Sequence, residues 1–126
     1  MSTFDPARYE ALERIFHEPN RLAIMSNLCA ADDGMNFTDL RNVCNLTDGN
    51  LNRHLKVLIE AGTIKIDKQF VDNKPRTTIR LSNTGLTRFN EYLSALADVL
   101  KQAQSAMPAT AKSKAHPLRG LRTATA

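Results

Sequence analysis

The stretch that most constrains this chain runs from Phe37 to Gly62, because it encodes two short helices joined by a tight turn. The first helix is predicted from Thr38 to about Cys44. The second opens at Thr47, whose hydroxyl can accept a hydrogen bond from the free backbone N–H three residues later. Gly62 is expected to end the second helix in the left-handed conformation, which glycine adopts at low cost.

The second helix, residues 47–61, is amphipathic. Its apolar stripe is expected to face a core and consists of Leu51, Leu55, Leu58 and Ile59. The remaining face carries small, polar and basic residues, namely Asp48, Gly49, Asn50, Asn52, Arg53, His54 and Lys56. Asn and Arg side chains pair bidentately with adenine and guanine edges, so this face is typical of a helix that reads the major groove. A plain solvated face is the alternative.

Two runs that alternate apolar and polar residues, 63–70 and 76–81, follow this helix and predict a β-hairpin. Residues 71–75 hold the turn formers of its tip. Lys68, Lys74 and Arg76 surround that tip. A basic hairpin directly after such a helix indicates a wing that grips backbone phosphate or an adjacent minor groove, although an ordinary surface hairpin would carry a similar pattern.

Four segments in this order resemble a known family: RLAIMSNL (21–28), FTDL (37–40), LTDGNLNRHLKVLIEAGTI (46–64) and KPRTTIRLSNTG (74–85). They are similar to the small winged-helix transcriptional regulators of prokaryotes related to the MarR and ArsR groups. The resemblance covers roughly residues 5–103. It implies a winged helix-turn-helix fold, mainly α with a small β-hairpin wing, with double-stranded DNA as ligand and a homodimer as the binding unit.

Carried over position by position, the resemblance assigns DNA contacts to the second helix and the wing. Base contacts are expected from Asn50, Asn52 and Arg53. Phosphate or minor-groove contacts are expected from Thr47, His54, Lys56, Lys68, Lys74 and Arg76. Gly49 would let the backbone approach the DNA, and Asp48 would have to accept from a cytosine amino group. Two departures stand out: Lys74 replaces the usual acidic residue of a MarR-like wing, and the cysteine motif of ArsR-like metal sensors is absent.

Charge is distributed unevenly along the 126 residues, whose net charge is +4. Residues 1–46 hold four Lys/Arg against seven Asp/Glu, residues 47–82 seven against four, and residues 83–126 six against two. The basic excess therefore lies in the predicted recognition helix, wing and tail, as expected of a nucleic-acid binder. Without a long apolar run or a signal peptide, the chain is expected to be soluble and cytoplasmic, with no membrane partner.

Helices are also predicted at residues 5–16, 20–30 and 82–102, with a short strand at 35–37. The last helix carries an apolar seam at alternating spacings of three and four: Leu86, Phe89, Leu93, Leu96, Leu100 and Ala103. Such a seam favours dimerisation through the first and last helices, or a helix that folds back on its own core. Residues 1–103 are expected to form one domain, and residues 104–126 a basic, disordered tail.

Catalytic and metal chemistry receive little support. His17, His54 and His116 lie on separate segments, and Cys29 and Cys44 lack metal-ligand spacing, so buried packing is the expected role of the two thiols. No cofactor and no enzymatic activity are expected. A protein-interaction module without sequence-specific DNA binding is the rival interpretation. The target site, the sign of regulation and any small-molecule effector stay open.

Overall fold

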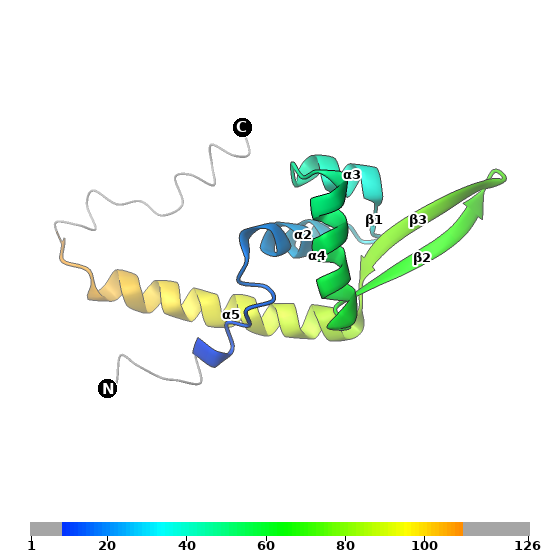
Figure 1. Cartoon of the computed structure of the whole chain (residues 1–126). Coiled ribbons are helices and arrows are strands. Elements are labelled where there is room, and N and C mark those ends of the chain that lie inside the picture. Colours follow the sequence, from blue (N-terminus) through cyan, green and yellow to red (C-terminus); the bar gives the residue numbers. More distant parts are fainter. Residues whose placement is uncertain (1–8, 110–126) are drawn as a thin grey trace.

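The fold combines a group of helices, a β-hairpin and one long C-terminal helix (Figure 1). The computed structural model describes residues 9–109. Within them the elements are α2 (Pro19–Ala30), β1 (Met35–Asn36), α3 (Phe37–Val43), α4 (Asp48–Glu60), β2 (Ile64–Val71), β3 (Lys74–Leu81) and α5 (Asn83–Ala106). Figure 1 shows the β2–β3 hairpin extending away from the helices. The predicted class, mainly helical with a small β-hairpin, is confirmed. Within the described residues, no helix is both long and apolar enough to cross a membrane.

The sheet has three antiparallel strands in the order β1-β3-β2. Ile66 of β2 and Met35 of β1 both pair with Ile79, so the predicted short strand flanks the base of the hairpin. It covers residues 35–36, whereas Phe37 already begins α3. The turn is tighter than the predicted tip. Only Asp72 and Asn73 lie between the strands, and both have positive φ, 53° and 63°. Two such residues are the signature of a type I′ turn, which matches the twist of the strands it joins.

The core lies where α2, α4 and α5 meet the base of the sheet. Three leucines of α4, Leu51, Leu55 and Leu58, are buried, as the amphipathic pattern predicted. An aromatic cluster adds Phe16, Phe89 and Tyr92, whose ring centroids lie 5.3 to 5.8 Å apart. Edge-to-face and offset aromatic pairs are favourable beyond the area that they bury. Phe16 therefore anchors the N-terminal segment against α5.

The base of the hairpin is fastened to α5 by a compact hydrogen-bond network. Ser82 caps α5 as predicted, since its hydroxyl accepts from the backbone N–H of Gly85 at 2.8 Å. The same hydroxyl donates to the carbonyl of Gly62 at 2.5 Å, and the Ser82 N–H donates to the Thr63 carbonyl at 3.0 Å. Thr63 in turn donates its buried hydroxyl to the carbonyl of Leu58 at 3.0 Å. The end of α4, the hairpin and the start of α5 are thus held in one fixed arrangement.

The predicted first helix, residues 5–16, is wrong over its second half. Residues 1–8 lie outside the described part of the chain; Tyr9 and Glu10 are helical, and residues 11–18 form turns and bends. The Glu13 carbonyl accepts from both the Phe16 and His17 N–H groups at 3.0 Å, which closes a turn. The Glu13 carboxylate is held by Arg88 of α5 at 2.5 Å. Tertiary contacts at Glu13 and Phe16 therefore override the helical pattern.

Helix α5 turns a different face to the core from the one its heptad pattern suggested. Its buried residues are Gly85, Phe89, Tyr92 and Ala95, whereas Leu86, Leu93 and Leu100 are exposed. The helix also continues to Ala106, so residues 104–106 of the predicted disordered tail are helical. Residues 110–126 lie outside the described part of the chain. Leu86, Leu93 and Leu100, which recur every seven residues, are therefore not covered by the core that residues 9–109 form.

Candidate nucleic-acid interface

Helix α4 forms for the local reasons that its sequence predicted. The Thr47 hydroxyl accepts from the backbone N–H of Asn50 at 3.2 Å, which makes Thr47 the N-cap. Gly62 follows the helix with φ of 75°, the left-handed conformation that favours glycine. Between these ends, the buried leucines hold one side of the helix against the core. Ile59 departs from the prediction, because it is partly exposed and faces the hairpin.

The opposite side of α4 presents polar and basic side chains to solvent. Five of the predicted DNA-contacting residues are exposed on it: Gly49, Asn50, Asn52, Arg53 and Lys56. The Arg53 guanidinium donates to the Asn50 side-chain oxygen at 3.4 Å, a long contact that leaves most of its donors free. A β-carbon added at Gly49 would meet no atom within 4 Å. The folded chain therefore does not require glycine at this position for steric reasons.

Asp48, an acidic residue on the helix that was predicted to face DNA, has a partner that the sequence analysis missed. Arg41 of α3 places its Nη1 atom 2.6 Å from Asp48 Oδ1. The carboxylate is therefore neutralised by α3 without needing a cytosine partner. The only signal in the sequence was an arginine in the preceding helix. Because the two residues are seven positions apart across a turn, their distance depended on the angle between α3 and α4.

His54 is buried, which removes it from the predicted DNA contacts. Its side chain is 3% exposed and lies between α4 and the start of α2. Its Nδ1 atom is 3.2 Å from Arg21 Nη1 and 3.7 Å from Glu18 Oε2. Burial lowers the pKa of His54 below its ordinary value, although Glu18 opposes this effect. A neutral His54 accepts from Arg21 at Nδ1 and so fixes α4 against α2.

The same cluster ties the N-terminal segment to the helices. Glu18 caps α2, since its carboxylate accepts from the Arg21 backbone N–H at 2.8 Å. Pro19 then occupies the first position of α2, where a missing N–H does no harm. The Arg21 side chain also donates through Nε to the carbonyl of Ile15 at 2.7 Å. The orientation of α4 is thus set by contacts that begin in residues 11–18.

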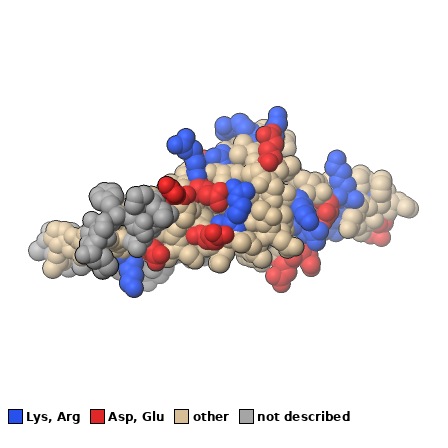
Figure 2. Space-filling view, turned by 90° about the horizontal axis from the view of Figure 1, so that it is seen from below, with Lys and Arg blue, Asp and Glu red and all other residues tan. Residues whose placement is uncertain are grey.

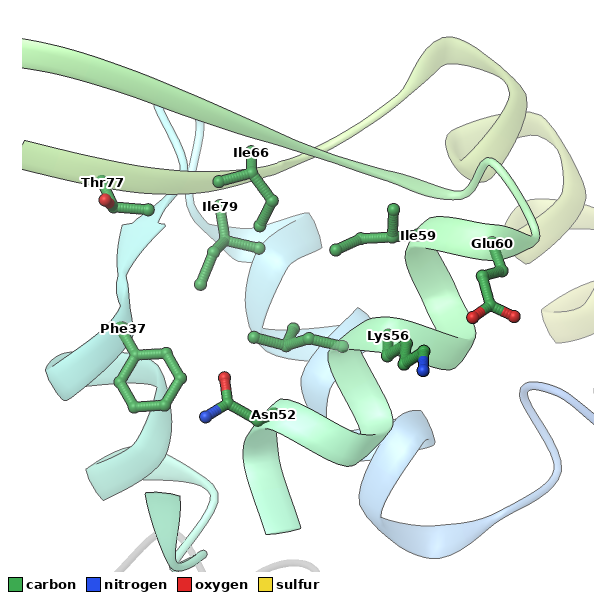
Figure 3. A pocket seen from close by; sticks show the side chains of 9 residues that line it. Phe37, Asn52, Lys56, Ile59, Glu60, Ile66, Thr77 and Ile79 are labelled. Atoms are coloured by element: carbon green, nitrogen blue, oxygen red, sulfur yellow. The ribbon is translucent and has the colours of Figure 1, made fainter. Parts of the chain in front are cut away.

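An apolar hollow of about 280 Å³ separates α4 from the hairpin. Figure 3 shows Ile59 of α4 facing Ile66 and Ile79 of the hairpin across it. Its lining is Phe37, Asn52, Leu55, Lys56, Ile59, Glu60, Ile66, Thr77 and Ile79. The exposed side of α4 and one face of the hairpin therefore border the same concave surface. Apolar atoms at such a site can contact thymine methyl groups, and Asn52 and Lys56 supply its polar edge.

The three cations of the predicted wing are exposed but lie on two faces. Alternation along β2 places Lys68 on the face of Ile66, toward α4. Arg76 lies on the opposite face, where it lines a polar hollow of about 400 Å³ with Asp67 and Arg80. Lys74 shares that outer face and flanks the turn. Cations therefore surround the hairpin end on both sides, as expected of an element that sits between two phosphate strands.

Ion pairing within the wing comes from a pair that the sequence analysis missed. Arg80 Nη2 lies 2.7 Å from Asp67 Oδ2, joining β3 to β2 near the base.

Figure 2 views the molecule from below the view of Figure 1 and shows Lys/Arg and Asp/Glu interspersed over the face seen there. Much of the molecule's charge is thus mixed in sign. The cations predicted to contact DNA are those of α4 and the hairpin end.

The cysteines and the acidic side chains suggest no metal centre in residues 9–109, where no three potential ligands come together. Cys29 is exposed and Cys44 is half-buried, so the expected buried packing is wrong for Cys29. Both are free thiols, and burial raises the pKa of each above its ordinary value. Raised thiol pKa values reduce the thiolate fraction and hence reactivity.

Known proteins share the sequence pattern and the fold of this chain. The family model described as a winged helix DNA-binding domain matches residues 20–100. An uncharacterized protein of Methanocaldococcus jannaschii is 31% identical over 91 residues, which cover 72% of this chain and 98% of that protein. The structure of a transcriptional regulator homologue from Pyrococcus horikoshii is 32% identical, with a TM-score of 0.67 over 74% of this chain and 92% of that one.

A solved protein–DNA complex shares the fold at low identity. The transcriptional repressor CouR, bound to a 23-mer DNA duplex, superposes with a TM-score of 0.66 over 95% of this chain and 87% of that one. Its sequence identity of 16% shows likeness of fold alone. The matched regions contain both the exposed side of α4 and the basic hairpin.

Proposed function

This chain belongs to the winged helix DNA-binding domain family, as its resemblance to small winged-helix regulators predicted, and we propose that it is a sequence-specific transcriptional regulator that binds duplex DNA as a homodimer. In this proposal α4 lies in the major groove and the β2–β3 hairpin, the wing, contacts the backbone or the neighbouring minor groove. The regulator acts in the cytoplasm and needs neither a cofactor nor a catalytic step. A small-molecule effector is compatible with it but is not identified.

The observation that carries the proposal is the exposed side of α4. Asn50, Asn52 and Arg53 project from a helix whose other side is fixed by buried leucines and by His54. Their amide and guanidinium groups are the donors and acceptors that distinguish adenine and guanine in the major groove. Because Gly49 has open space around it, the start of α4 can approach a phosphate closely.

Phosphate contacts would come from residues around this reading surface. Lys56 borders the hollow beside Asn52, and the wing contributes Lys68, Lys74 and Arg76. Thr47 is exposed at the helix start, where its hydroxyl hydrogen can donate to a phosphate while its oxygen caps α4. Such contacts position the protein on the duplex and do not read sequence.

Dimerisation is proposed through α5. Leu86, Leu93 and Leu100 are 54%, 40% and 50% exposed and recur at seven-residue intervals along one side of the helix. That spacing is the seam of a two-helix interface, which a second copy of α5 would cover. The predicted first helix is helical only at Tyr9 and Glu10 among its described residues, so the proposed interface rests on α5. A symmetric dimer would place two α4 helices in successive major grooves, with half-sites about 10 bp apart.

The dimer is tested by introducing a charge into the seam. Leu93→Glu is expected to convert the protein from twice its 14.0 kDa mass to a monomer in sedimentation equilibrium at micromolar concentration. Thr87→Glu places the same charge at an exposed polar position of the same helix, more than a quarter of a turn away from the seam, and is expected to leave the dimer intact. A wild-type protein that sediments only as a 14.0 kDa species would rule out the dimer.

The regulator proposal is tested by fluorescence anisotropy of labelled duplexes across a salt series. Tight binding to one duplex should weaken steeply with salt, because each phosphate contact releases counterions, with log K falling by about 0.9 per contact per log unit of salt. Random-sequence duplexes of equal length are the control. Absence of binding to every duplex at low salt would favour the rival function, a protein-interaction module. A salt-independent affinity would also contradict phosphate contact.

A further inference from the structure

The end of the wing carries an apolar pair that the fold does not use. Phe70 is 80% exposed, the highest value among the described large hydrophobic residues. Pro75 pairs directly with it across the hairpin and is also exposed. Directly paired residues of antiparallel strands project from the same face, so the two rings form one apolar surface. We call Phe70 and Pro75 the wing pair.

The wing pair lies beyond the part of the sheet that the core covers. The last buried hydrophobic residue along this face is Ile79, and half-buried Thr77 is the last residue of the face that lines the hollow against α4. Phe70 is four residues beyond Ile66 along β2, which corresponds to about 13 Å of extended strand. It therefore makes no contribution to the core, and its ring faces the same side as the hollow between α4 and the wing.

Basic side chains lie next to the wing pair on both faces of the hairpin. Lys68 precedes Phe70 by two residues on the same face, while Lys74 and Arg76 flank Pro75 on the outer face. An apolar surface with cations on both sides complements a groove whose walls are phosphate and whose floor is base edges and sugars. A protein partner with an apolar docking surface would not require these three neighbouring cations.

The reach of the wing agrees with such a groove. Successive major grooves on one side of B-DNA are about 34 Å apart, so the neighbouring minor groove lies roughly 17 Å from the one that α4 would occupy. The wing extends about 13 Å from Ile66 to Phe70, and the aromatic side chain adds to this length. The two-residue turn at Asp72 and Asn73 keeps the end narrow.

We propose that Phe70 and Pro75 form an apolar wedge that enters the minor groove beside the major groove held by α4 and bends the duplex there. Proteins that bind minor grooves insert Phe and Pro side chains in this way, unstacking a base step and kinking the DNA. The wedge would favour a TA step at this position, because pyrimidine–purine steps deform readily. This inference rests on the proposed function.

The experiment compares the full chain with Phe70→Thr on a bound duplex that carries a TA step at the wing position. Threonine keeps strand propensity while removing the ring, so the hairpin is retained. Val71→Thr is the matched control, since Val71 lies next to Phe70 but points to the opposite face of the hairpin. Affinity is measured by anisotropy, and bending by energy transfer between dyes at the two duplex ends.

The expected result is a loss of about tenfold or more in affinity for Phe70→Thr, corresponding to the lost burial of one aromatic ring. The end-to-end distance of the duplex should lengthen, and the preference for TA over a GC step should disappear. Val71→Thr should behave as wild type in all three measurements.

The outcomes that overturn the wedge differ from those that overturn the regulator. Equal affinity and equal bending for wild type and Phe70→Thr would refute the wedge while leaving DNA binding intact. Loss of self-association in Phe70→Thr with unchanged DNA affinity would assign the wing pair to a second copy of the chain instead. A wild-type protein that binds no duplex would refute both proposals.

Discussion

Replacing Gly85 by alanine is expected to lower the free energy of unfolding by about 3 kcal/mol, because the added methyl group has no room. A β-carbon at Gly85 would collide with the Thr63 carbonyl oxygen and lie 2.7 Å and 2.8 Å from the Thr63 carbonyl carbon and Cα. These are backbone atoms of the junction that Ser82 ties together. Relief would require α5 to move from the base of the wing. Chemical denaturation followed by circular dichroism measures the loss.

Gly49→Ala is the matched control, since both glycines lie in the first turn of a helix. Alanine at position 49 meets no atom within 4 Å, so no steric penalty arises. Its better helix propensity is expected to raise stability by less than about 1 kcal/mol. Destabilisation of similar size in both variants would show that the packing of Gly85 against Thr63 is not the cause.

Arg53→Ala is expected to weaken binding to the preferred duplex by about 1–3 kcal/mol, a factor of roughly 5 to 150. The guanidinium is exposed and its only described hydrogen bond is the 3.4 Å contact to Asn50, so the fold should not change. The variant should also relax preference at one base-pair position, because an arginine–guanine contact reads that base. Anisotropy against a panel of single-substitution duplexes measures both effects.

Lys74→Ala is the companion variant on the wing. A lysine at a phosphate contributes to all duplexes alike, so its loss should weaken binding uniformly and reduce the salt slope by about 1. Unlike Arg53→Ala, it should leave the ranking of the single-substitution duplexes unchanged. Small and equal effects from both variants would contradict the division of roles between α4 and the wing.

The sequence determined most of the local structure, because the responsible interactions join near neighbours. Thr47 and Ser82 cap their helices as predicted, and Gly62 ends α4 with positive φ. Alternation along residues 63–81 predicted the hairpin and which of its faces packs inward. Caps, turns and periodicity depend on a few adjacent residues, so they can be read without knowing the rest of the molecule.

The candidate site was predictable where exposure followed from that same periodicity. Asn50, Asn52, Arg53 and Lys56 are exposed because they lie opposite three leucines on a single helix. The exposure of His54 was predicted wrongly, because His54 lies on the edge of the apolar stripe. Whether an edge residue is covered depends on the neighbouring element, and here α2 places Glu18 and Arg21 against it.

Only the tertiary structure decided which interactions join distant segments. The seam of α5 could have faced the core with Leu86 and Leu93, but Phe16 and the close approach of Gly85 to Thr63 turned Phe89 and Tyr92 inward. The ion pairs of Arg41 with Asp48 and of Arg88 with Glu13 likewise depend on how helices cross. A 3.6-residue period defines the faces of a helix, but the face that is buried follows from the shape and charge of what packs against it.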